Sequence, residues 1–524
     1  MLTIPDNLNA ACYFIDQNVD AGRAQNVAIE SGEQKLTYEQ LLQRSNRLGN
    51  ALRALGVQPE ERVCLILQDS PEFLYSFFGA IKIGAVPVPL NTFLRPHEYE
   101  YMLSDMRARV VIVSQELAGP LYRSFQGLTC VVVGTEEGDH LSFDDVCSKA
   151  SAELAAYPTS KDHAAFWLYS SGSTGSPKGC VHLHHDMLFP TEFYARNILH
   201  IRETDRCYSV AKLFFAYGLG NAGYFPLSVG AATILSAPRP TPERVYANIE
   251  RYRPTLFFSV PSNYAALLAH TRVGRDFDLS SIRHAISAGE PLPPALFHRF
   301  KDRFGIEILD ALGSTEMLHM VVSNYPGAVK PGSSGRVIPG YEARIVDESN
   351  QDVPAGEIGN LLVKCDATCA GYWNQHEKTK DAFVGDWFRT GDKYYQDSDG
   401  FFWYAGRADD LFKVNGQWVS PTEVEAALIL HPSVMEAAVV ARQDGEGLPK
   451  PAAYVVVCSE FSPTSSLAVE LQKWVAEKLT WHKSPRWIEF LDELPKTATG
   501  KLQRFKLRER PGGPPNLSAG GRIG

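Results

Sequence analysis

Strand and helix signals alternate through the first third of the chain, and this alternation restricts the fold more than any other feature of the sequence. Thr37 and Gln40 have capping-box spacing ahead of leucines that recur at helical intervals until Gly56. Strand-like and helical segments then follow in turn at 62–68, 71–84, 85–90, 97–106 and 108–114. Such alternation is typical of βαβ units, so we predict an α/β domain built on a mostly parallel sheet.

The character of the sequence changes twice beyond this region. From about residue 326 glycine and proline separate short strand signals, which predicts a small β-rich subdomain over 326–406. After it, helix and strand signals indicate a compact α+β unit over 407–510. We therefore predict an N-terminal domain over 1–406, a smaller C-terminal domain, and a disordered tail over 511–524 that lacks apolar periodicity.

The composition excludes several classes of protein. The formal net charge of −9 gives no support for a nucleic-acid or anionic-membrane partner. The first residues lack a basic segment followed by an apolar run, and Lys82, Gly84 and two prolines interrupt the most apolar stretch. The nine cysteines show no zinc-site spacing, and their odd number fits reduced thiols. We therefore expect a cytoplasmic protein.

The most informative segment for function is a serine- and glycine-rich loop at 169–179. It follows an apolar, strand-like run, and Lys178 lies near its end. Glycines let backbone N–H groups approach phosphates, hydroxyls add donors, and the lysine adds positive charge. The spacing is not that of a Walker motif, and a flexible linker has no need of this lysine. We therefore predict a phosphate-binding loop.

Two other patterns are weaker. Gly218, Gly220 and Gly223 have G-x-G-x-x-G spacing, but aromatic residues and Pro226 follow where a phosphate-binding helix would begin, which argues against a dinucleotide site. The second pattern has the residue types of a metal site and comprises His182, His184, His185 and Asp186. No further ligand set accompanies these residues, so we interpret them as polar positions at a strand end.

Six motifs in order along roughly residues 10–510 resemble those of the adenylate-forming superfamily, which includes acyl- and aryl-CoA ligases, nonribosomal-peptide adenylation domains and firefly-type luciferases. The motifs are YSSGSTGSPKG (169–179), DALGSTEM (310–317), WFRTGD (387–392), GRADDLFKVNG (406–416), SPTEVE (420–425) and PKTATGKLQR (495–504). The resemblance implies the adenylate-forming enzyme fold with a mobile C-terminal domain. It also implies that ATP activates a carboxylic acid as acyl-AMP, with release of pyrophosphate, before the acyl group passes to coenzyme A.

The resemblance implies a role for each polar residue around ATP. Ser170, Thr174 and Lys178 would hold the β- and γ-phosphates. Thr315 would offer its hydroxyl to the α-phosphate, and Glu316 would hold Mg²⁺. The residues expected around the adenine are Gly289, Glu290, Pro291, Asp310, Leu312, Gly313 and Ser314.

The C-terminal motifs complete the implied mechanism. Asp392 would accept both ribose hydroxyls beside Arg407, and Lys501 would bridge the acid and the α-phosphate in the transition state. The C-terminal domain would turn about Asp409 between the two half-reactions. The residues expected along the CoA channel are Gly416 and Trp418.

The segments FFAYGLG (214–220) and GSTEMLHM (313–320) look most like those of benzoate and hydroxybenzoate CoA ligases. The residues expected around the acid are Ala216, Tyr217, Gly218, Leu312, His319 and Met320. Bulky Tyr217 and His319 suit a short, flat ring, so we predict benzoate or a substituted benzoate. The alternatives are a cinnamate-like or fatty acid, and an adenylation enzyme that loads a carrier domain.

The implied partners are an aromatic acid, ATP and CoA, with Mg²⁺ as cofactor, and the chain would be a monomer or homodimer. A luciferase-like oxygenase shares the ligase chemistry, but the benzoate-like acid segments argue against it. The presence of Glu316, Asp392 and Lys501 together favours an enzyme over a nucleotide-binding protein without activity. Relatives in the benzoate group also imply a lysine acetyltransferase acting on Lys501, because acetylation removes the lysine charge.

Overall fold

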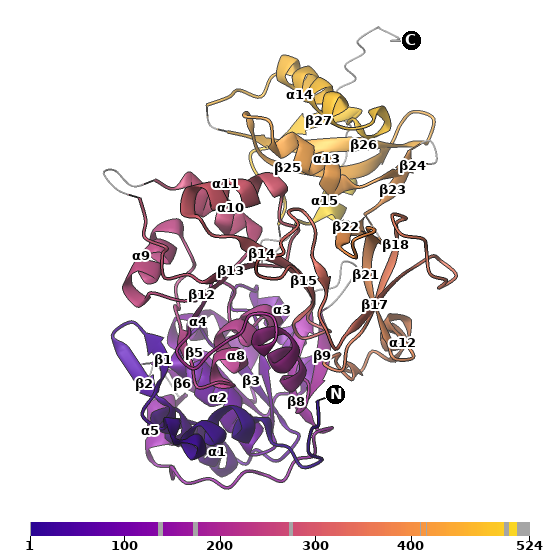
Figure 1. Cartoon of the computed structure of the whole chain (residues 1–524). Coiled ribbons are helices and arrows are strands. Elements are labelled where there is room, and N and C mark those ends of the chain that lie inside the picture. Colours follow the sequence, from indigo (N-terminus) through magenta and orange to yellow (C-terminus); the bar gives the residue numbers. More distant parts are fainter. Residues whose placement is uncertain are drawn as a thin grey trace. The chain divides into compact units, whose positions relative to one another are not determined.

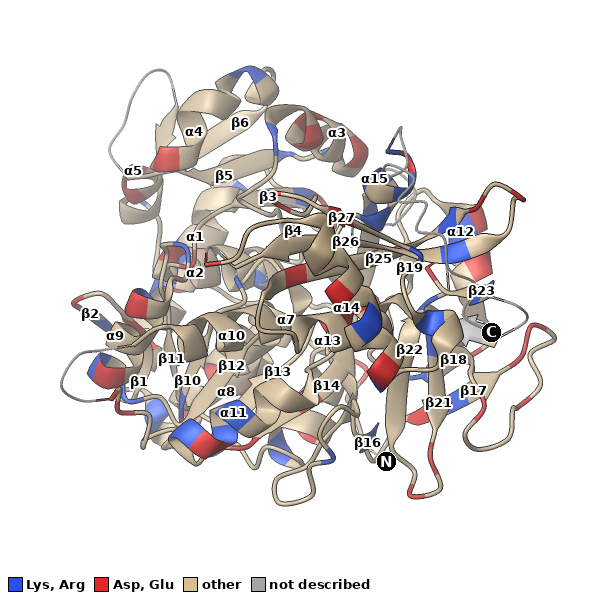
Figure 2. Cartoon of the chain, turned by 90° about the horizontal axis from the view of Figure 1, so that it is seen from above, with Lys and Arg blue, Asp and Glu red and all other residues tan. Residues whose placement is uncertain are grey.

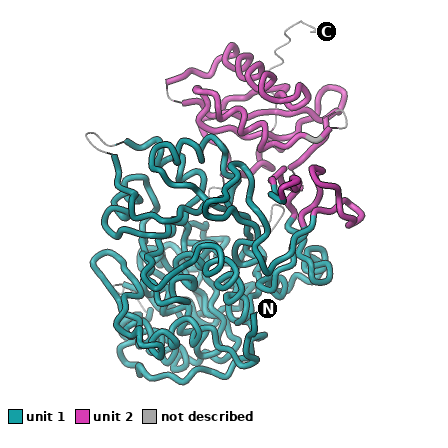
Figure 3. The backbone as a smooth tube through the Cα atoms, in the orientation of Figure 1, with its two compact units in different colours: residues 1–344, 362–390, 400–402 teal, residues 345–361, 391–399, 403–524 magenta. Residues whose placement is uncertain are grey.

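The computed structural model describes residues 2–134, 140–170, 177–271, 276–408, 410–414, 417–458, 460–496 and 502–510, without the side chain of Trp418 (Figure 1). The chain forms two compact units (Figure 3). Unit 1 comprises 1–344, 362–390 and 400–402, and unit 2 comprises 345–361, 391–399 and 403–524. The division falls within four strands, which are β17 (Glu342–Val346), β18 (Gly359–Lys364), β21 (Trp387–Gln396) and β22 (Phe402–Arg407). The domain boundary at residue 406 stays a prediction.

The largest sheet of unit 1 has nine strands. In order across the sheet they are β16 (Arg336–Val337), β15 (Met320–Ser323), β14 (Ile308–Gly313), β13 (His284–Ser287), β12 (Leu256–Ser259), β10 (Arg206–Ser209), β11 (Ala232–Ile234), β1 (Val27–Ser31) and β2 (Gln34–Thr37). The central strands from β14 to β1 are parallel, whereas β15, β16 and β2 join antiparallel. The predicted α/β class is therefore confirmed.

A second sheet of unit 1 follows the predicted strand and helix segments closely. Its parallel strands, in order, are β4 (Val86–Pro89), β3 (Arg62–Ile66), β5 (Val110–Ser114), β6 (Thr129–Val133) and β7 (Leu141–Ser142). The accompanying helices are α1 (Tyr38–Ala54), α2 (Pro71–Lys82), α3 (Pro96–Met106), α4 (Gln115–Leu121) and α5 (Phe143–Ser148). The capping box at the start of α1 is confirmed, because Gln40 N donates to Thr37 Oγ1 and Thr37 N donates to Gln40 Oε1.

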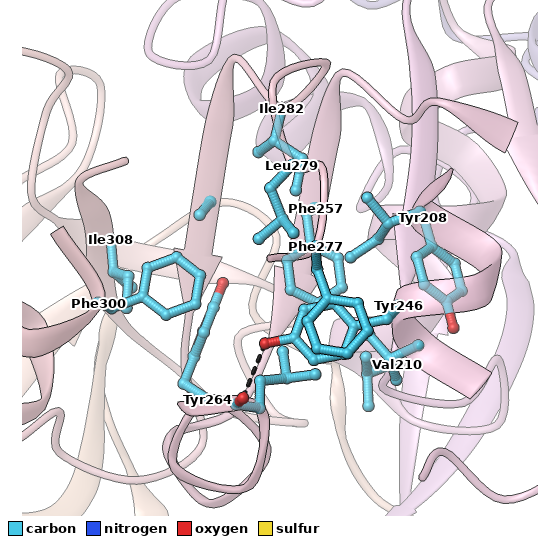
Figure 4. Close-up of a cluster of buried hydrophobic side chains, with 14 of the residues drawn as sticks. Tyr208, Val210, Tyr246, Phe257, Tyr264, Phe277, Leu279, Ile282, Phe300 and Ile308 are labelled. Carbon is cyan, nitrogen blue, oxygen red and sulfur yellow. Dashed lines mark hydrogen bonds between the residues drawn. The ribbon is translucent and has the colours of Figure 1, made fainter. Parts of the chain in front are cut away.

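Three helices pack an aromatic core against the nine-stranded sheet, and these are α9 (Pro242–Tyr252), α10 (Pro261–Ala269) and α11 (Pro294–Phe304) (Figure 4). The Tyr246 and Phe277 rings stack at 3.6 Å between centroids. The buried Tyr246 hydroxyl donates to Leu267 O at 2.7 Å, so no polar atom of this side chain is left unsatisfied. This core lies against β12, β13 and β14, and it fixes the strand ends from which the candidate site is built.

A small antiparallel sheet in unit 1 comprises β8 (Ala164–Ser170), β9 (Lys178–Leu183) and β19 (Gly371–Tyr372). The short helices of unit 1 include α6 (Leu188–Pro190), α7 (Ala216–Leu219), η5 (Gly220–Tyr224), α8 (Phe225–Leu227) and α12 (His376–Ala382). Figure 2 shows basic and acidic residues interspersed on surface helices such as α12. Within the described residues, no helix combines the length and apolarity needed to span a lipid bilayer.

Unit 2 contains the predicted α+β elements of the C-terminal region. Its main sheet comprises β25 (Val434–Gln443), β26 (Pro449–Val457) and β27 (Trp487–Phe490). The neighbouring elements are β23 (Phe412–Val414), β24 (Gln417–Val419), α13 (Pro421–Ile429), α14 (Ser465–Lys478) and α15 (Arg504–Arg508). Apolar side chains of α13 and α14 pack with the sheet in one cluster, so this region has a hydrophobic core of its own.

Candidate functional site

The predicted phosphate loop connects the two strands of a β-hairpin. Ser170 at the end of β8 pairs with Lys178 at the start of β9, so both side chains start from the end of the hairpin at which the loop connects the strands. The loop residues 171–176 lie outside the described residues, and Thr174 is among them. Antiparallel pairing up to Ser170 and Lys178 thus fixes both ends of a short loop that is rich in glycine and serine.

The Glu316 carboxylate lies against the same hairpin end. Its Oε1 atom accepts hydrogen bonds from Ser170 Oγ at 3.1 Å and from Tyr372 Oη at 3.0 Å, and Lys178 Nζ lies 3.9 Å away. Glu316 is 9% exposed. The structure therefore brings together three of the predicted ATP-site residues, Ser170, Lys178 and Glu316, although two of them are far from the third in sequence.

Tyr372 is a member of this cluster that the sequence did not indicate. Its ring lies under Lys178, with Nζ 4.1 Å from the ring centroid. Burial, together with the negative charge of Glu316, raises the pKa of the Tyr372 hydroxyl, so this group stays protonated and acts as the donor to the carboxylate. Tyr372 lies outside all six motifs. The pairing of β19 with β9 in the structure is what brings it into this cluster.

Thr315 and Glu316 lie in a tight turn between β14 and β15. Thr315 O accepts from Leu318 N at 3.2 Å, and Glu316 O accepts from Cys369 N at 2.8 Å. Leu318 has a φ of 64°, a left-handed conformation that is costly for a branched side chain. A second group from β9 also binds the Thr315 carbonyl, since His182 Nε2 lies 2.9 Å from it. Hydrogen bonds from Cys369 and from His182 thus hold the turn at two successive carbonyl groups.

The residues predicted around adenine lie after β13 or within and directly after β14, toward the carboxyl ends of these strands. Ser287 and Asp310 are neighbours across these strands, and Gly289 has a φ of 90°. Asp310 Oδ2 accepts from Leu292 N at 3.3 Å, while Oδ1 is buried without a hydrogen-bond partner among the described residues. Burial raises the pKa of Asp310 to about 8. Open α/β sheets bind ligands at this carboxyl edge, which is consistent with the predicted role.

The predicted acid pocket lies at the same edge of the sheet. The Tyr217 hydroxyl lies within hydrogen-bond distance of two carbonyl oxygens near the carboxyl ends of β12 and β13, Ser259 O at 3.2 Å and Ile286 O at 3.3 Å. The Tyr217 and His319 rings are 5.8 Å apart. His319 Nε2 lies 3.1 Å from Asn221 Oδ1, and burial lowers the pKa of His319 to about 3. Neither ring therefore carries a charge, as the predicted site for an aromatic ring requires.

Close packing explains the small residues in this segment. A Cβ atom on Gly218 would lie 2.0 Å from Lys212 O, and one on Gly220 would lie 2.4 Å from the His319 ring. These two glycines therefore allow a backbone carbonyl and an aromatic ring to approach α7 and η5 closely. Ala216 and Met320 are buried, and Met320 opens β15 opposite Gly313. Leu312 pairs with Val322 on the same two strands.

The residues predicted to bind the ribose belong to unit 2. Asp392 Oδ1 pairs with Arg407 Nη1 at 3.0 Å, across β21 and β22. Gly391 has a φ of 75°, and a Cβ atom there would lie 2.8 Å from the Arg407 guanidinium, so the arginine packs directly on this backbone. Besides Thr174, four predicted positions lie outside the description of the structure, and these are Asp409, Gly416, Lys501 and the side chain of Trp418.

The residues present suit one magnesium ion rather than a protein-enclosed metal site. Among the described residues, no group of three or more His, Cys, Asp or Glu side chains could hold a metal ion. The cluster at His182 and its neighbours therefore forms no such group. Mg²⁺ commonly uses one or two carboxylates together with substrate phosphates and water. The single carboxylate of Glu316, next to Lys178 and Ser170, fits that donor set.

The fold and the order of these residues define an adenylate-forming enzyme. Residues 16–373 match the AMP-binding enzyme family, and residues 423–501 match the AMP-binding enzyme C-terminal domain. The chain belongs to the AMP-binding enzyme family.

Three relatives show the position of the chain within this family. It is 46% identical over 513 residues to a benzoate–CoA ligase of Thauera aromatica, with 97% of each chain covered. A solved benzoate CoA ligase from Burkholderia xenovorans LB400 is 44% identical, with a TM-score of 0.88 and coverage of 96% of this chain and 100% of that one. A solved anthranilate CoA ligase in complex with anthranoyl-AMP is 42% identical, with a TM-score of 0.91 and coverage of 96% and 97%.

Proposed function

We propose that the chain is an ATP-dependent benzoate–CoA ligase that forms AMP. The observation that carries this proposal is the pair of uncharged rings of Tyr217 and His319, in a chain that is 46% identical to a benzoate–CoA ligase over nearly its whole length. Two rings 5.8 Å apart at the carboxyl edge of the sheet suit a flat aromatic acid. We infer a cytoplasmic location, as the sequence predicts.

In the first half-reaction, a benzoate oxygen attacks the α-phosphorus of ATP. The new O–P bond forms as the bond to the β-phosphate oxygen breaks, and pyrophosphate leaves. Ser170, Thr174 and Lys178 hold the β- and γ-phosphates, and Thr315 orients the α-phosphate by its hydroxyl. Mg²⁺ held by Glu316 would neutralise phosphate charge. Lys501 places its ammonium between the two reacting anions and offsets their repulsion.

In the second half-reaction, the CoA thiol releases its proton to water and attacks the carbonyl carbon of benzoyl-AMP. The thioester bond forms, and AMP leaves with the bonding electrons. Asp392 keeps the ribose in place through both steps, with Arg407 beside it. The C-terminal domain turns about Asp409, so that Lys501 withdraws and the loop with Gly416 and Trp418 guides the pantetheine arm.

A substituted benzoate is the second candidate substrate. The similarity to an anthranilate CoA ligase, at 42% identity, favours this reading because anthranilate is an aminobenzoate. Met320, an unbranched side chain at the start of β15, adds a flexible wall that can adapt to a ring substituent.

Mass spectrometry of competing substrates tests the function. The protein is incubated with ATP, Mg²⁺, CoA and equimolar benzoate, hydroxybenzoates, anthranilate, phenylacetate, cinnamate and hexanoate. We expect benzoyl-CoA as the main thioester, with a matching amount of AMP. A dominant cinnamoyl- or hexanoyl-CoA would contradict the pocket interpretation, and acyl-AMP without thioester would indicate a carrier-loading enzyme.

Two further features of this proposal concern assembly and regulation. The chain would act as a monomer or homodimer, which sedimentation measures directly. A lysine acetyltransferase would inactivate it by modifying Lys501, since acetylation removes the ammonium charge on which adenylation depends. Full adenylation activity of protein acetylated at Lys501 would contradict this regulation.

A further inference from the structure

His182 is a buried residue of β9 with two well-defined hydrogen-bond partners. Its side chain is 0% exposed, and its ring stacks on Phe166 at 5.0 Å between centroids with 17° between the planes. Nδ1 lies 2.9 Å from Asp186 Oδ2, and Nε2 lies 2.9 Å from Thr315 O. The stacking and the two contacts leave the ring a single orientation.

The partners determine where the proton of His182 lies. A backbone carbonyl can only accept a hydrogen bond, so Nε2 carries a proton and donates it to Thr315 O. Asp186, whose side chain is fully buried, holds Nδ1 through its Oδ2 atom, which also accepts from Leu183 N at 3.0 Å. A carboxylate that orients an imidazole in this way fixes which nitrogen acts as the donor.

The Thr315 carbonyl belongs to the turn that presents both the Thr315 hydroxyl and the Glu316 carboxylate. Inside the turn it accepts from Leu318 N, and His182 provides its anchor from β9. β9 begins at Lys178, so the strand that carries the phosphate-binding lysine also carries the residue that holds the opposite wall. His182 thus links the strand that begins at Lys178 to the turn that contains Thr315 and Glu316.

We propose that His182, oriented by Asp186, is a positioning residue for adenylation. It holds the Thr315 carbonyl, and thereby places the Thr315 hydroxyl to contact the α-phosphate of ATP and the Glu316 carboxylate to hold Mg²⁺. This role rests on the proposed function, since Thr315 and Glu316 act on ATP only in that reaction. His182 touches no reacting atom, and its effect passes through the turn. The change expected on its removal is therefore in the rate of the adenylation step, with binding of the acid retained.

Two amide substitutions separate the bonds of His182. A glutamine amide reaches the position of Nε2, so His182→Gln keeps the donor to Thr315 O and loses the bond to Asp186. An asparagine amide reaches only the position of Nδ1, so His182→Asn keeps the bond to Asp186 and loses the one to Thr315 O. The matched control is His184→Asn, because buried His184 accepts from Ala10 N at 3.1 Å and does not belong to the turn.

The assay is benzoate-dependent exchange of pyrophosphate into ATP, with melting temperatures measured beside it. We expect His182→Asn to lower kcat about tenfold with the KM for benzoate within about twofold, because one hydrogen bond to a buried carbonyl is lost. His182→Gln should stay within about threefold of the wild type, as should the control. Equal losses in the two His182 variants, a wild-type kcat in His182→Asn, or a change confined to the KM for benzoate would overturn the proposal.

Amide hydrogen exchange of residues 314–319 gives a readout without substrate. We expect faster exchange at Leu318 in His182→Asn than in the wild type, with His182→Gln close to the wild type, and unchanged exchange would overturn the proposal. If the wild type activates no acid, the proposed function fails and this measurement alone decides the positioning role. If His182→Asn does not fold, His182→Gln decides, and a loss in kcat of more than about tenfold at an unchanged melting temperature overturns it.

Discussion

The contact between Tyr372 and Glu316 offers a sensitive test of the ATP site. Tyr372→Phe removes the hydroxyl that donates to Glu316 Oε1 at 3.0 Å but keeps the ring under the Lys178 ammonium. Tyr372→Leu removes both interactions. The two variants therefore separate the hydroxyl, which orients the carboxylate, from the aromatic face, which holds the lysine.

The contacts that each variant loses set the expected decrease in activity. A hydrogen bond to a charged group contributes about 1.5–3 kcal/mol, but Glu316 Oε1 keeps its bond from Ser170 at 3.1 Å, so we expect a loss of about 1–2 kcal/mol. This corresponds to about a 5- to 30-fold decrease in kcat/KM for Mg·ATP. Tyr372→Leu also loses the cation–π contact of Lys178, worth about 1 kcal/mol at a partly buried site, so its activity should fall about fivefold further.

Pyrophosphate exchange at saturating benzoate and varied Mg·ATP measures these effects, with Tyr99→Phe as the control, because Tyr99 Oη donates to a backbone carbonyl of Asn91 outside the site. Adding Ser170→Ala to Tyr372→Phe should cost more than the sum of the single changes, since the carboxylate oxygen then loses both donors. Wild-type kinetics in both Tyr372→Phe and Tyr372→Leu would refute the reasoning that this cluster positions Glu316 for Mg·ATP.

Three further predictions follow from the acid, adenine and lysine sites. Lys501→Ala should lose benzoyl-AMP formation but still convert added benzoyl-AMP to benzoyl-CoA, as single-turnover assays of each half-reaction would measure; loss of both would contradict the assigned role. Asp310 has a pKa of about 8 against an ordinary 3.8, so the folded protein keeps a proton that the unfolded chain releases, and the free energy of unfolding falls as pH rises through this range. Asp310→Asn should remove that dependence. In urea unfolding, the free energy of unfolding of the variant should therefore rise relative to that of the wild type between about pH 5 and about pH 8.5; parallel pH profiles would argue against the burial effect. Gly218→Ala should raise the KM for benzoate by about tenfold or more and lower the melting temperature, because its Cβ would lie 2.0 Å from Lys212 O, whereas Gly223→Ala, with only ordinary contacts from 3.5 Å, should resemble the wild type in both measurements.

The local features of this protein are determined by its sequence alone. The capping box at Thr37 and Gln40, the buried strand runs and the helix stops depend on neighbours a few residues apart, so periodicity and turn chemistry are sufficient to predict them. The same holds for the motifs that indicate adenylate chemistry, because each is a short stretch whose residue types suit phosphate, ribose or metal. The α/β class and the family could therefore be predicted before the structure was known.

Only the tertiary structure decides which of these short stretches meet. Tyr372 reaches Glu316 across 56 residues, and His182 reaches Thr315 across 133. The sequence assigned neither residue to the ATP site. From sequence alone, His182 is interpreted as a polar position at a strand end. Their contacts arise because β9 pairs with β19 while the turn after β14 packs on both. Strand pairing and packing of this kind depend on the whole fold, since no local propensity specifies which distant strands come to lie side by side.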